Sequence, residues 1–207
     1  MALKQQFSFN TPLIKATRDY VAAYIAANFP SNITYHNMGH VNEVVKAAKK
    51  IGKAIDLSDD EFEIVVLAAW FHDIGYHSGH LGHENRSADI AKSFLLEKEF
   101  PAEKTNRVIG CIKATRVPQE PSNLLEDVVC DADLYHLGSD KFEEKSDELW
   151  DELKAQGTDL SYFEWLKTSR DFIKSHKYHT SCAREKLGPI KRENLRRLEQ
   201  TIERMKQ

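Results

Sequence analysis

Apolar residues recur three or four positions apart along most of the chain, which is the spacing of a buried helix face. The stripe that follows Gly39 includes Val41, Val44, Ala48 and Ile51. The same spacing predicts further helices over about 85–99, 102–116, 122–137, 140–155 and 161–176. No alternating run of β-branched residues is long enough to predict a sheet. The predicted fold class is therefore all-α, a single bundle of roughly eight to ten helices.

Capping residues mark several helix ends. Thr11-Pro12 places a hydroxyl before a proline and predicts a helix that runs to about Asn28. Ser58 and Glu61 form a capping-box pattern ahead of a third helix, whose buried face includes Phe62, Val65, Ala69 and Trp70. Gly188-Pro189 predicts the start of the last helix. One stripe of that helix packs on the core or forms a dimer face, and it consists of Leu195, Leu198, Ile202 and Met205.

Composition narrows the class of protein. The 207 residues include 29 Lys plus Arg and 32 Asp plus Glu, a formal charge of −3. No general electrostatic attraction to a nucleic-acid polymer is therefore expected. No apolar stretch is long enough to cross a membrane, and residues 1–10 lack the apolar segment of a signal peptide. Cys111, Cys130 and Cys182 lie far apart, which favours reduced thiols. We therefore expect a cytoplasmic protein.

Histidines and acidic residues gather in three places. His36 and His40 lie in Tyr35-His36-Asn37-Met38-Gly39-His40, at the start of the second helix. His72-Asp73 ends an apolar helix, where both groups lose hydration unless they pair or bind a cation. Asp131 and Asp133 lie on opposite edges of the apolar stripe of a later helix. Periodicity does not decide which of these two carboxylates faces a shared cleft.

The order of these residues resembles the HD superfamily of metal-dependent phosphohydrolases, over roughly residues 34 to 138. The segments AAWFHDIGY and CDADLYHLGS look like a small subgroup described only as predicted phosphohydrolases. The resemblance implies that His40, His72, Asp73 and Asp133 are metal ligands. It places His36 where the related cyclic-nucleotide phosphodiesterases keep a general acid. It implies a single HD domain over 1–207, with helices 139–207 packed on the core.

The implied cofactor is one divalent ion, among Mn, Mg, Ni, Co, Fe and Zn, which would activate water and neutralise phosphate charge. Asp73 has two oxygens and is therefore suited both to catalysis and to bridging a second ion. The phosphodiesterases carry another His where this chain has Tyr76. His77, His80, His83 and Glu84 follow in a Gly- and His-rich loop predicted from Ile74 to about Glu84. Three roles are open for these four residues: ligands of a second metal ion, contacts to substrate, or parts of a solvated loop.

Cationic side chains are candidates for holding a phosphate group. Lys113 and Arg116 share a helix face, and Arg86 opens the helix after the His-rich loop. With His83 and Glu84 they are the predicted substrate-binding residues, although a solvated helix face also accounts for Lys113 and Arg116. The predicted function is hydrolysis of a phosphate ester of a small metabolite, with a nucleotide favoured. The alternatives are a catalytically silent module that binds metal and nucleotide, and a helical scaffold; a homodimer is compatible with each.

Overall fold

The computed structural model describes residues 11–206, and this part of the chain contains nine α-helices, two short 3-10 helices and no strand. The prediction of an all-α fold is confirmed for these residues. The segment 1–10, from which the absence of a signal peptide was argued, lies outside them. None of the helices described combines the length and hydropathy needed to span a membrane.

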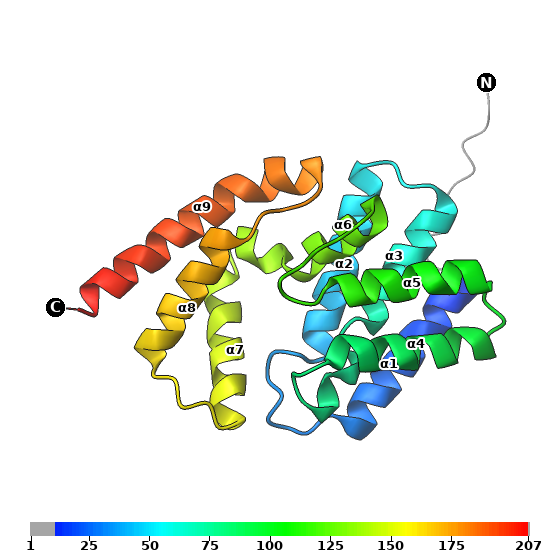
Figure 1. The fold of residues 1–207 in the computed structure, drawn as a ribbon, viewed down its shortest axis with the longest axis horizontal. Coiled ribbons are helices and arrows are strands. Elements are labelled where there is room, and N and C mark those ends of the chain that lie inside the picture. Colours follow the sequence, from blue (N-terminus) through cyan, green and yellow to red (C-terminus); the bar gives the residue numbers. More distant parts are fainter. Residues whose placement is uncertain (1–10, 207) are drawn as a thin grey trace.

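The first six α-helices surround one large apolar core. They are α1 (Pro12–Asn28), α2 (Met38–Ala54), α3 (Asp59–Phe71), α4 (His83–Glu97), α5 (Ala102–Ala114) and α6 (Leu124–Asp133). The short helix η1 (Ile74–Ser78) joins α3 to α4. Every residue of α3 from Ile64 to Phe71 is buried, as expected for a helix that is apolar on all sides. Helices α1, α2, α5 and α6 pack around α3, which is therefore the centre of this half (Figure 1).

The remaining elements form a second group beside the first six helices. They are η2 (Tyr135–Gly138), α7 (Phe142–Ala155), α8 (Tyr162–Ser175) and α9 (Ser181–Arg204). Leu137, Phe142, Trp165 and Ile173 belong to a separate apolar cluster that these elements share. Figure 1 shows α7, α8 and α9 together on one side, joined to α6 through η2.

Two predicted helix starts are confirmed by their hydrogen bonds. The Thr11 side chain accepts the N–H of Ile14 at 3.2 Å, so the hydroxyl caps α1 as predicted. The N–H of Ser58 donates to the Glu61 carboxylate at 3.1 Å, one half of the predicted capping box. Helix α2 begins at Met38, one residue before Gly39, because the Asn37 side chain caps it.

Three predicted boundaries are wrong. The last helix begins at Ser181 instead of after Gly188-Pro189, and Pro189 lies inside it. The Thr180 hydroxyl caps this helix, and its turns through Leu187 pack on η2, so these contacts outweigh the hydrogen bond that proline removes. The helix predicted over 122–137 ends at Asp133 and continues as η2. Helix α4 starts at His83, earlier than predicted, so the His-rich loop is shorter.

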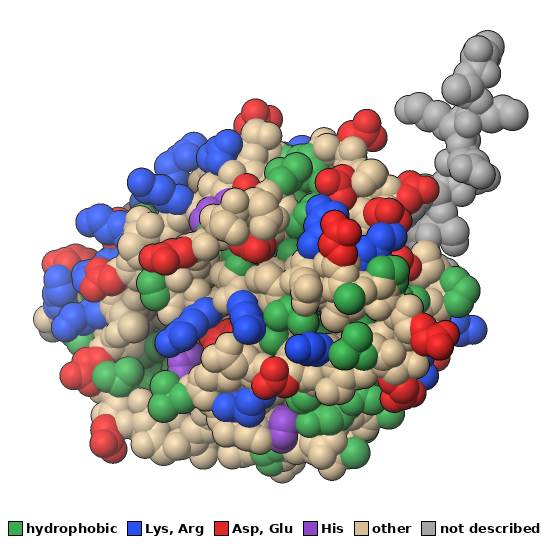
Figure 2. All heavy atoms as spheres, turned by 45° about the vertical axis from the view of Figure 1, so that its right-hand side comes forward, with side chains coloured by type: hydrophobic (Ala, Val, Ile, Leu, Met, Phe, Trp, Pro, Cys, Tyr) green, Lys and Arg blue, Asp and Glu red, His purple; other side chains and the backbone are tan. Residues whose placement is uncertain are grey.

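The outer face of α9 is charged and its inner face is apolar. Acidic and basic side chains are intermixed along the edge of the molecule where α9 runs, at upper left in Figure 2. Arg196 pairs with Glu193 one turn earlier, as is usual on a solvated helix face. On the other face Leu198 and Ile202 are buried, whereas Met205 is exposed. Most of the stripe thus packs within the chain, and a homodimer stays a prediction.

Candidate metal centre

Four side chains predicted as metal ligands come together where three helices begin or end. His40 lies in the first turn of α2, His72 and Asp73 follow the last turn of α3, and Asp133 is the last residue of α6. One ligand atom from each of the four lies within 4.8 Å of the others. His40, His72 and Asp73 are buried, and Asp133 is half-buried at the wall of a cavity.

The donor atoms of this cluster face a common point. Asp73 Oδ2 lies 3.2 Å from His40 Nε2 and 3.0 Å from His72 Nε2. Asp133 Oδ1 lies 3.4 Å and 3.5 Å from the same two nitrogens, which are 3.2 Å apart. Two imidazoles and two carboxylates are a donor set that binds first-row divalent ions. The side chains present therefore fit the ion that the sequence implied.

Hydrogen bonding and charge prepare the cluster for a cation. His72 Nδ1 donates to the carbonyl oxygen of Ala69 at 2.9 Å, which leaves Nε2 with its lone pair toward the centre. Burial alone would lower the pKa of His72, but Asp73 and Asp133 outweigh burial and raise that pKa well above its usual value. Burial alone would raise the pKa of Asp73, but the charge of His72 and hydrogen bonds from three imidazoles hold it well below its usual value. The carboxylates thus favour positive charge in a buried site, and a divalent cation would supply that charge in place of protons.

A glycine shapes the chain just after the cluster. A Cβ on Gly75 would lie 2.5 Å from the carbonyl oxygen of His83 and 2.6 Å from the backbone nitrogen of Ser87. The Gly75 N–H donates to the Ser87 hydroxyl at 2.9 Å. This close approach holds η1 against the start of α4 and brings His83 beside Asp73.

The structure separates the two candidate carboxylates of α6. Asp133 faces the metal cluster, whereas Asp131 is fully buried on another side of the helix. The Asp131 carboxylate accepts the N–H of His179 at 2.7 Å and both the N–H and the hydroxyl of Thr180, at 2.8 Å and 2.7 Å. Since Thr180 caps α9, Asp131 fixes the segment that leads into that helix.

The histidines of the His-rich segment point in different directions. His83 Nε2 lies 3.3 Å from Asp73 Oδ1, the oxygen that faces away from His40 and His72, while its Nδ1 donates to the carbonyl of His80. His80 is exposed and lines the cavity. His77 packs against the ring of Tyr24 on α1 and does not line the cavity. Of the three, His83 alone reaches a carboxylate of the cluster.

His36 is held beside the cluster by a glutamate from the second half of the chain. His36 Nδ1 lies 2.5 Å from Glu152 Oε1. The other carboxylate oxygen of Glu152 accepts the backbone N–H groups of Tyr35 and His36, at 2.8 Å and 3.0 Å. The His36 ring stacks on Tyr76, with ring centroids 3.7 Å apart. Because Nδ1 is engaged, Nε2 is the nitrogen left to face the cavity.

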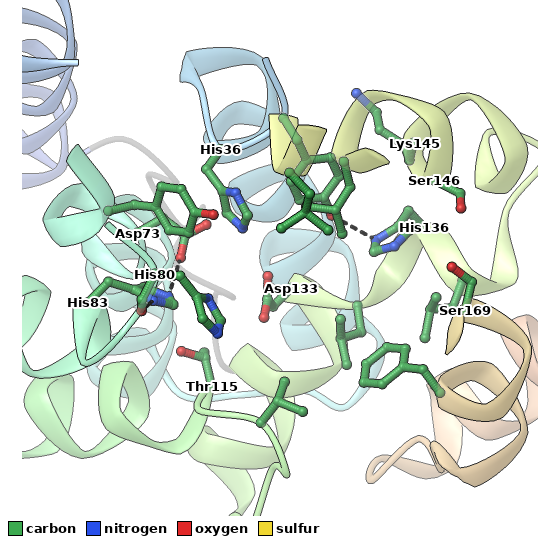
Figure 3. A pocket seen from close by; sticks show the side chains of 18 of the residues that line it. His36, Asp73, His80, His83, Thr115, Asp133, His136, Lys145, Ser146 and Ser169 are labelled. Atoms are coloured by element: carbon green, nitrogen blue, oxygen red, sulfur yellow. Dashed lines mark hydrogen bonds and ion pairs between the residues drawn. The ribbon is translucent and has the colours of Figure 1, made fainter. Parts of the chain in front are cut away.

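A cavity of about 530 Å³ lies in front of the cluster, between the two helix groups. Figure 3 shows His36, Asp73, His80 and His83 on one side, Asp133 in the middle, and Ser146, His136 and Ser169 on the other. The C-terminal elements thus supply the wall of the cavity that lies opposite the metal cluster.

The predicted substrate-binding residues divide into two sets. Arg116, His83 and Glu84 line the cavity, the last two being buried. Lys113 is exposed on α5 and does not line it. Arg86 is also absent from the lining, and its guanidinium donates to the carbonyl oxygens of Gly75, Leu81 and Gly79. The Arg86 side chain therefore stabilises the segment between η1 and α4 through these hydrogen bonds.

Sequence reasoning missed Glu152 and His136. Glu152 is fully buried, although it lies in a helix rich in acidic residues that reads as a charged surface. The signal available was spacing, because Lys145, Leu149 and Glu152 share one helix face. His136 lines the cavity, and burial lowers its pKa to about 4, so it is neutral near pH 7.

Comparisons with known proteins agree with this arrangement. Residues 37–138 match the family model described as HD domain. The fold is similar to the crystal structure of a predicted HD superfamily hydrolase from an uncultured Thermotogales bacterium, with a TM-score of 0.56 and 17% sequence identity over 90% of each chain. At that identity the likeness concerns the fold alone. None of the curated proteins matches this chain.

Proposed function

The chain carries an HD domain over residues 37–138, and on that premise we propose that it is a metal-dependent phosphohydrolase acting on a phosphate ester of a small metabolite. The observation that carries the proposal is the four-residue cluster, whose ligand atoms lie within 4.8 Å of one another at the wall of a cavity. A nucleotide is the substrate class we favour, since the cavity of about 530 Å³ is of the size that holds such ligands.

His40, His72, Asp73 and Asp133 would hold one divalent ion. When bound, such an ion neutralises charge on phosphoryl oxygens and makes water acidic enough to act as a nucleophile near neutral pH. We assign Asp73 a second task. Its Oδ1 faces His83 instead of the cluster centre, so this oxygen is placed to accept a hydrogen bond from an attacking water.

We assign His36 the role of general acid. Its Nδ1–H donates to Glu152, so a proton carried on Nε2 is directed toward the cavity. Transfer of that proton to the leaving oxygen completes hydrolysis, because an alkoxide is a poor leaving group until protonated. Glu152 orients the ring without touching substrate.

His83, Glu84 and Arg116 are the residues we propose for contacting the substrate, since all three line the cavity. Arg116 supplies positive charge for phosphate oxygens. Lys113 and Arg86 are the other two residues predicted to bind substrate, and neither lines the cavity. This placement favours a solvated helix face for Lys113 and a structural role for Arg86, which hydrogen-bonds the loop backbone.

The test is phosphate release by the purified protein. The protein is stripped with chelator, reloaded singly with Mn²⁺, Mg²⁺, Ni²⁺, Co²⁺, Fe²⁺ or Zn²⁺, and assayed against nucleotides and simple phosphate esters. We expect activity that is restored by metal and lost in His72→Ala and Asp73→Ala, with Lys113→Ala as the matched surface control. Activity that persists in both cluster variants contradicts the proposal. Tight metal and nucleotide binding without turnover identifies a silent binding module instead.

A further inference from the structure

The part of the cavity formed by the C-terminal elements differs in chemistry from the part beside the metal cluster. We call it the apolar compartment and define it by six lining residues from η2, α7 and α8: Leu137, Phe142, Leu149, Leu153, Trp165 and Phe172. Leucine and aromatic side chains bury apolar surface and offer few partners for charge.

Positive charge is scarce along this cavity. The lysines and arginines that line it, among the residues described, are Arg116 and Lys145. Lys145 is already paired, because its Nζ lies 2.8 Å from Glu148 Oε2 and 3.2 Å from Glu43 Oε2. Arg116 follows α5 and therefore belongs to the other wall. The apolar compartment thus has no unpaired cation of its own to receive an anion.

Neutral hydrogen-bonding groups are nevertheless present. Trp165 and Ser169 line the cavity and are each 8% exposed. The Trp165 Nε1 and Ser169 Oγ atoms are buried and find no hydrogen-bond partner among the residues described. Buried polar groups are normally satisfied, so these two atoms are available to hydrogen-bond a polar substituent of a ligand.

We propose that the apolar compartment receives the uncharged, largely apolar organic part of a phosphate monoester, and that the protein therefore discriminates against substrates with additional phosphate groups. The inference rests on the proposed function, which places the scissile phosphate at the metal cluster. A second or third phosphate would then lie among leucine and aromatic side chains. Moving an unpaired charge out of water into such surroundings is strongly unfavourable.

A cationic alternative exists on another side of the cluster. A smaller cavity of about 290 Å³ shares His40 and Asp133 with the cluster. Four lysines line it, Lys46, Lys50, Lys141 and Lys145, together with the carboxylates of Glu43 and Asp140. A polyphosphate tail would be drawn there instead of into the apolar compartment. The two cavities therefore predict opposite substrate preferences, which makes the proposal testable.

The first experiment needs neither metal nor turnover. Chelated protein is titrated calorimetrically with 1-naphthol, an uncharged aryl alcohol, and separately with inorganic triphosphate. We expect naphthol to bind, and Leu149→Trp to weaken that binding about tenfold or more by filling the compartment. The matched control is Leu195→Trp, which alters a half-buried leucine of the same apolar cluster outside the cavity. Ser146→Phe fills the same cavity if Leu149→Trp fails to fold.

The second experiment compares kcat/KM for AMP and ATP in metal-loaded protein. We expect AMP to be favoured about tenfold or more, and Leu149→Lys to reduce that ratio because it adds a cation to the compartment. Leu195→Lys is the control and should leave the ratio unchanged.

Two results overturn the inference: equal binding of naphthol to the wild type and Leu149→Trp, or a higher kcat/KM for ATP than for AMP. If Lys46→Gln and Lys50→Gln remove such a preference for ATP, the smaller cavity is its source. Failure of the proposed function is a different result: no phosphate ester is hydrolysed, while Leu149→Trp still weakens naphthol binding.

Discussion

The first six helices and the last three contribute different things to one site. Helices α2, α3 and α6 hold the four clustered ligands on helix ends anchored in a large core. Helices α7 and α8 share a smaller core and contribute one fully buried carboxylate, Glu152, and an apolar wall. On the proposed function, the first group would bind the ion, and the second would orient the proposed acid His36 and select the substrate.

The largest effect should come from the ion-binding half. Asp133→Asn removes a charged ligand atom from the cluster, so metal content and kcat/KM should both fall, the latter by about 1000-fold or more. Elemental analysis and phosphate release provide the measurements. The chain supplies a matched variant two residues away, because Asp131→Asn should leave metal content unchanged. Full metal content in Asp133→Asn would remove that residue from the ligand set.

The next effect concerns the link between the halves. Asp131→Ala leaves the backbone N–H groups of His179 and Thr180 and the Thr180 hydroxyl without their acceptor. The free energy of unfolding should fall by about 3 kcal/mol, because the stranded donors are buried or half-buried. Urea denaturation with chelator present measures the loss. Asp131→Asn keeps one acceptor oxygen and should lose less; equal losses would mean that the hydrogen bonds are not the cause.

A smaller effect tests the contribution of α7 to catalysis. Glu152→Gln keeps the shape of the side chain but removes the charge opposite His36. We expect kcat to fall about 10- to 100-fold with metal content unchanged, because a neutral amide oxygen holds the imidazole N–H less firmly than a carboxylate does. The control is Glu148→Gln on the same helix, which pairs with Lys145 instead. Loss of metal in Glu152→Gln would show that the two halves do not divide the work in this way.

Acid should weaken the second half through His176. Burial lowers the pKa of His176 to about 3, below its ordinary value of 6.5. Between these values the unfolded chain binds the proton and the folded chain does not, so stability falls as the pH falls from 6.5 toward 3. In His176→Gln the fall between pH 7 and pH 5 should be smaller, by at most about 2 kcal/mol. Chemical denaturation of both proteins at the two pH values measures this fall. An equal fall in the wild type and in His176→Gln would exclude His176 as the cause.

The smallest effects separate the two cationic candidates of the first half. Arg116→Ala should raise KM about threefold to fivefold, because its side chain lines the cavity and is solvated. Lys113→Ala should leave kcat/KM within about twofold, as is typical of an exposed side chain. Steady-state kinetics in parallel distinguishes them. A larger effect at Lys113 would reinstate the helix face as the phosphate-binding surface.

Local patterns predicted the first half better than the second. The helix starts at Thr11 and Ser58 depend on neighbouring residues only, and both are confirmed. The order of His40, His72-Asp73 and Asp133 indicated which residues meet, although periodicity left Asp131 and Asp133 equivalent. What separates those two is the segment at Thr180, which lies far along the chain.

The start of α9 and the role of Glu152 depend on contacts that local sequence does not contain. Gly138 shows why: a Cβ there would lie 2.6 Å from Leu187 Cβ, so η2 and α9 meet at a contact distance that only glycine permits. This packing stabilises turns that Gly188-Pro189 would locally interrupt. Glu152 is separated from His36 by more than a hundred residues, and a lone acidic residue in a charged helix carries no sign of its partner.

Helix α6 carries Asp131 and Asp133 two positions apart, and this has a consequence for how the chain tolerates change. A single inserted residue between them would turn one relative to the other by about 100° around the helix. Either the cation would lose a ligand or α9 would lose its tether. Insertions and deletions in this stretch should therefore be far more harmful than substitutions of similar size.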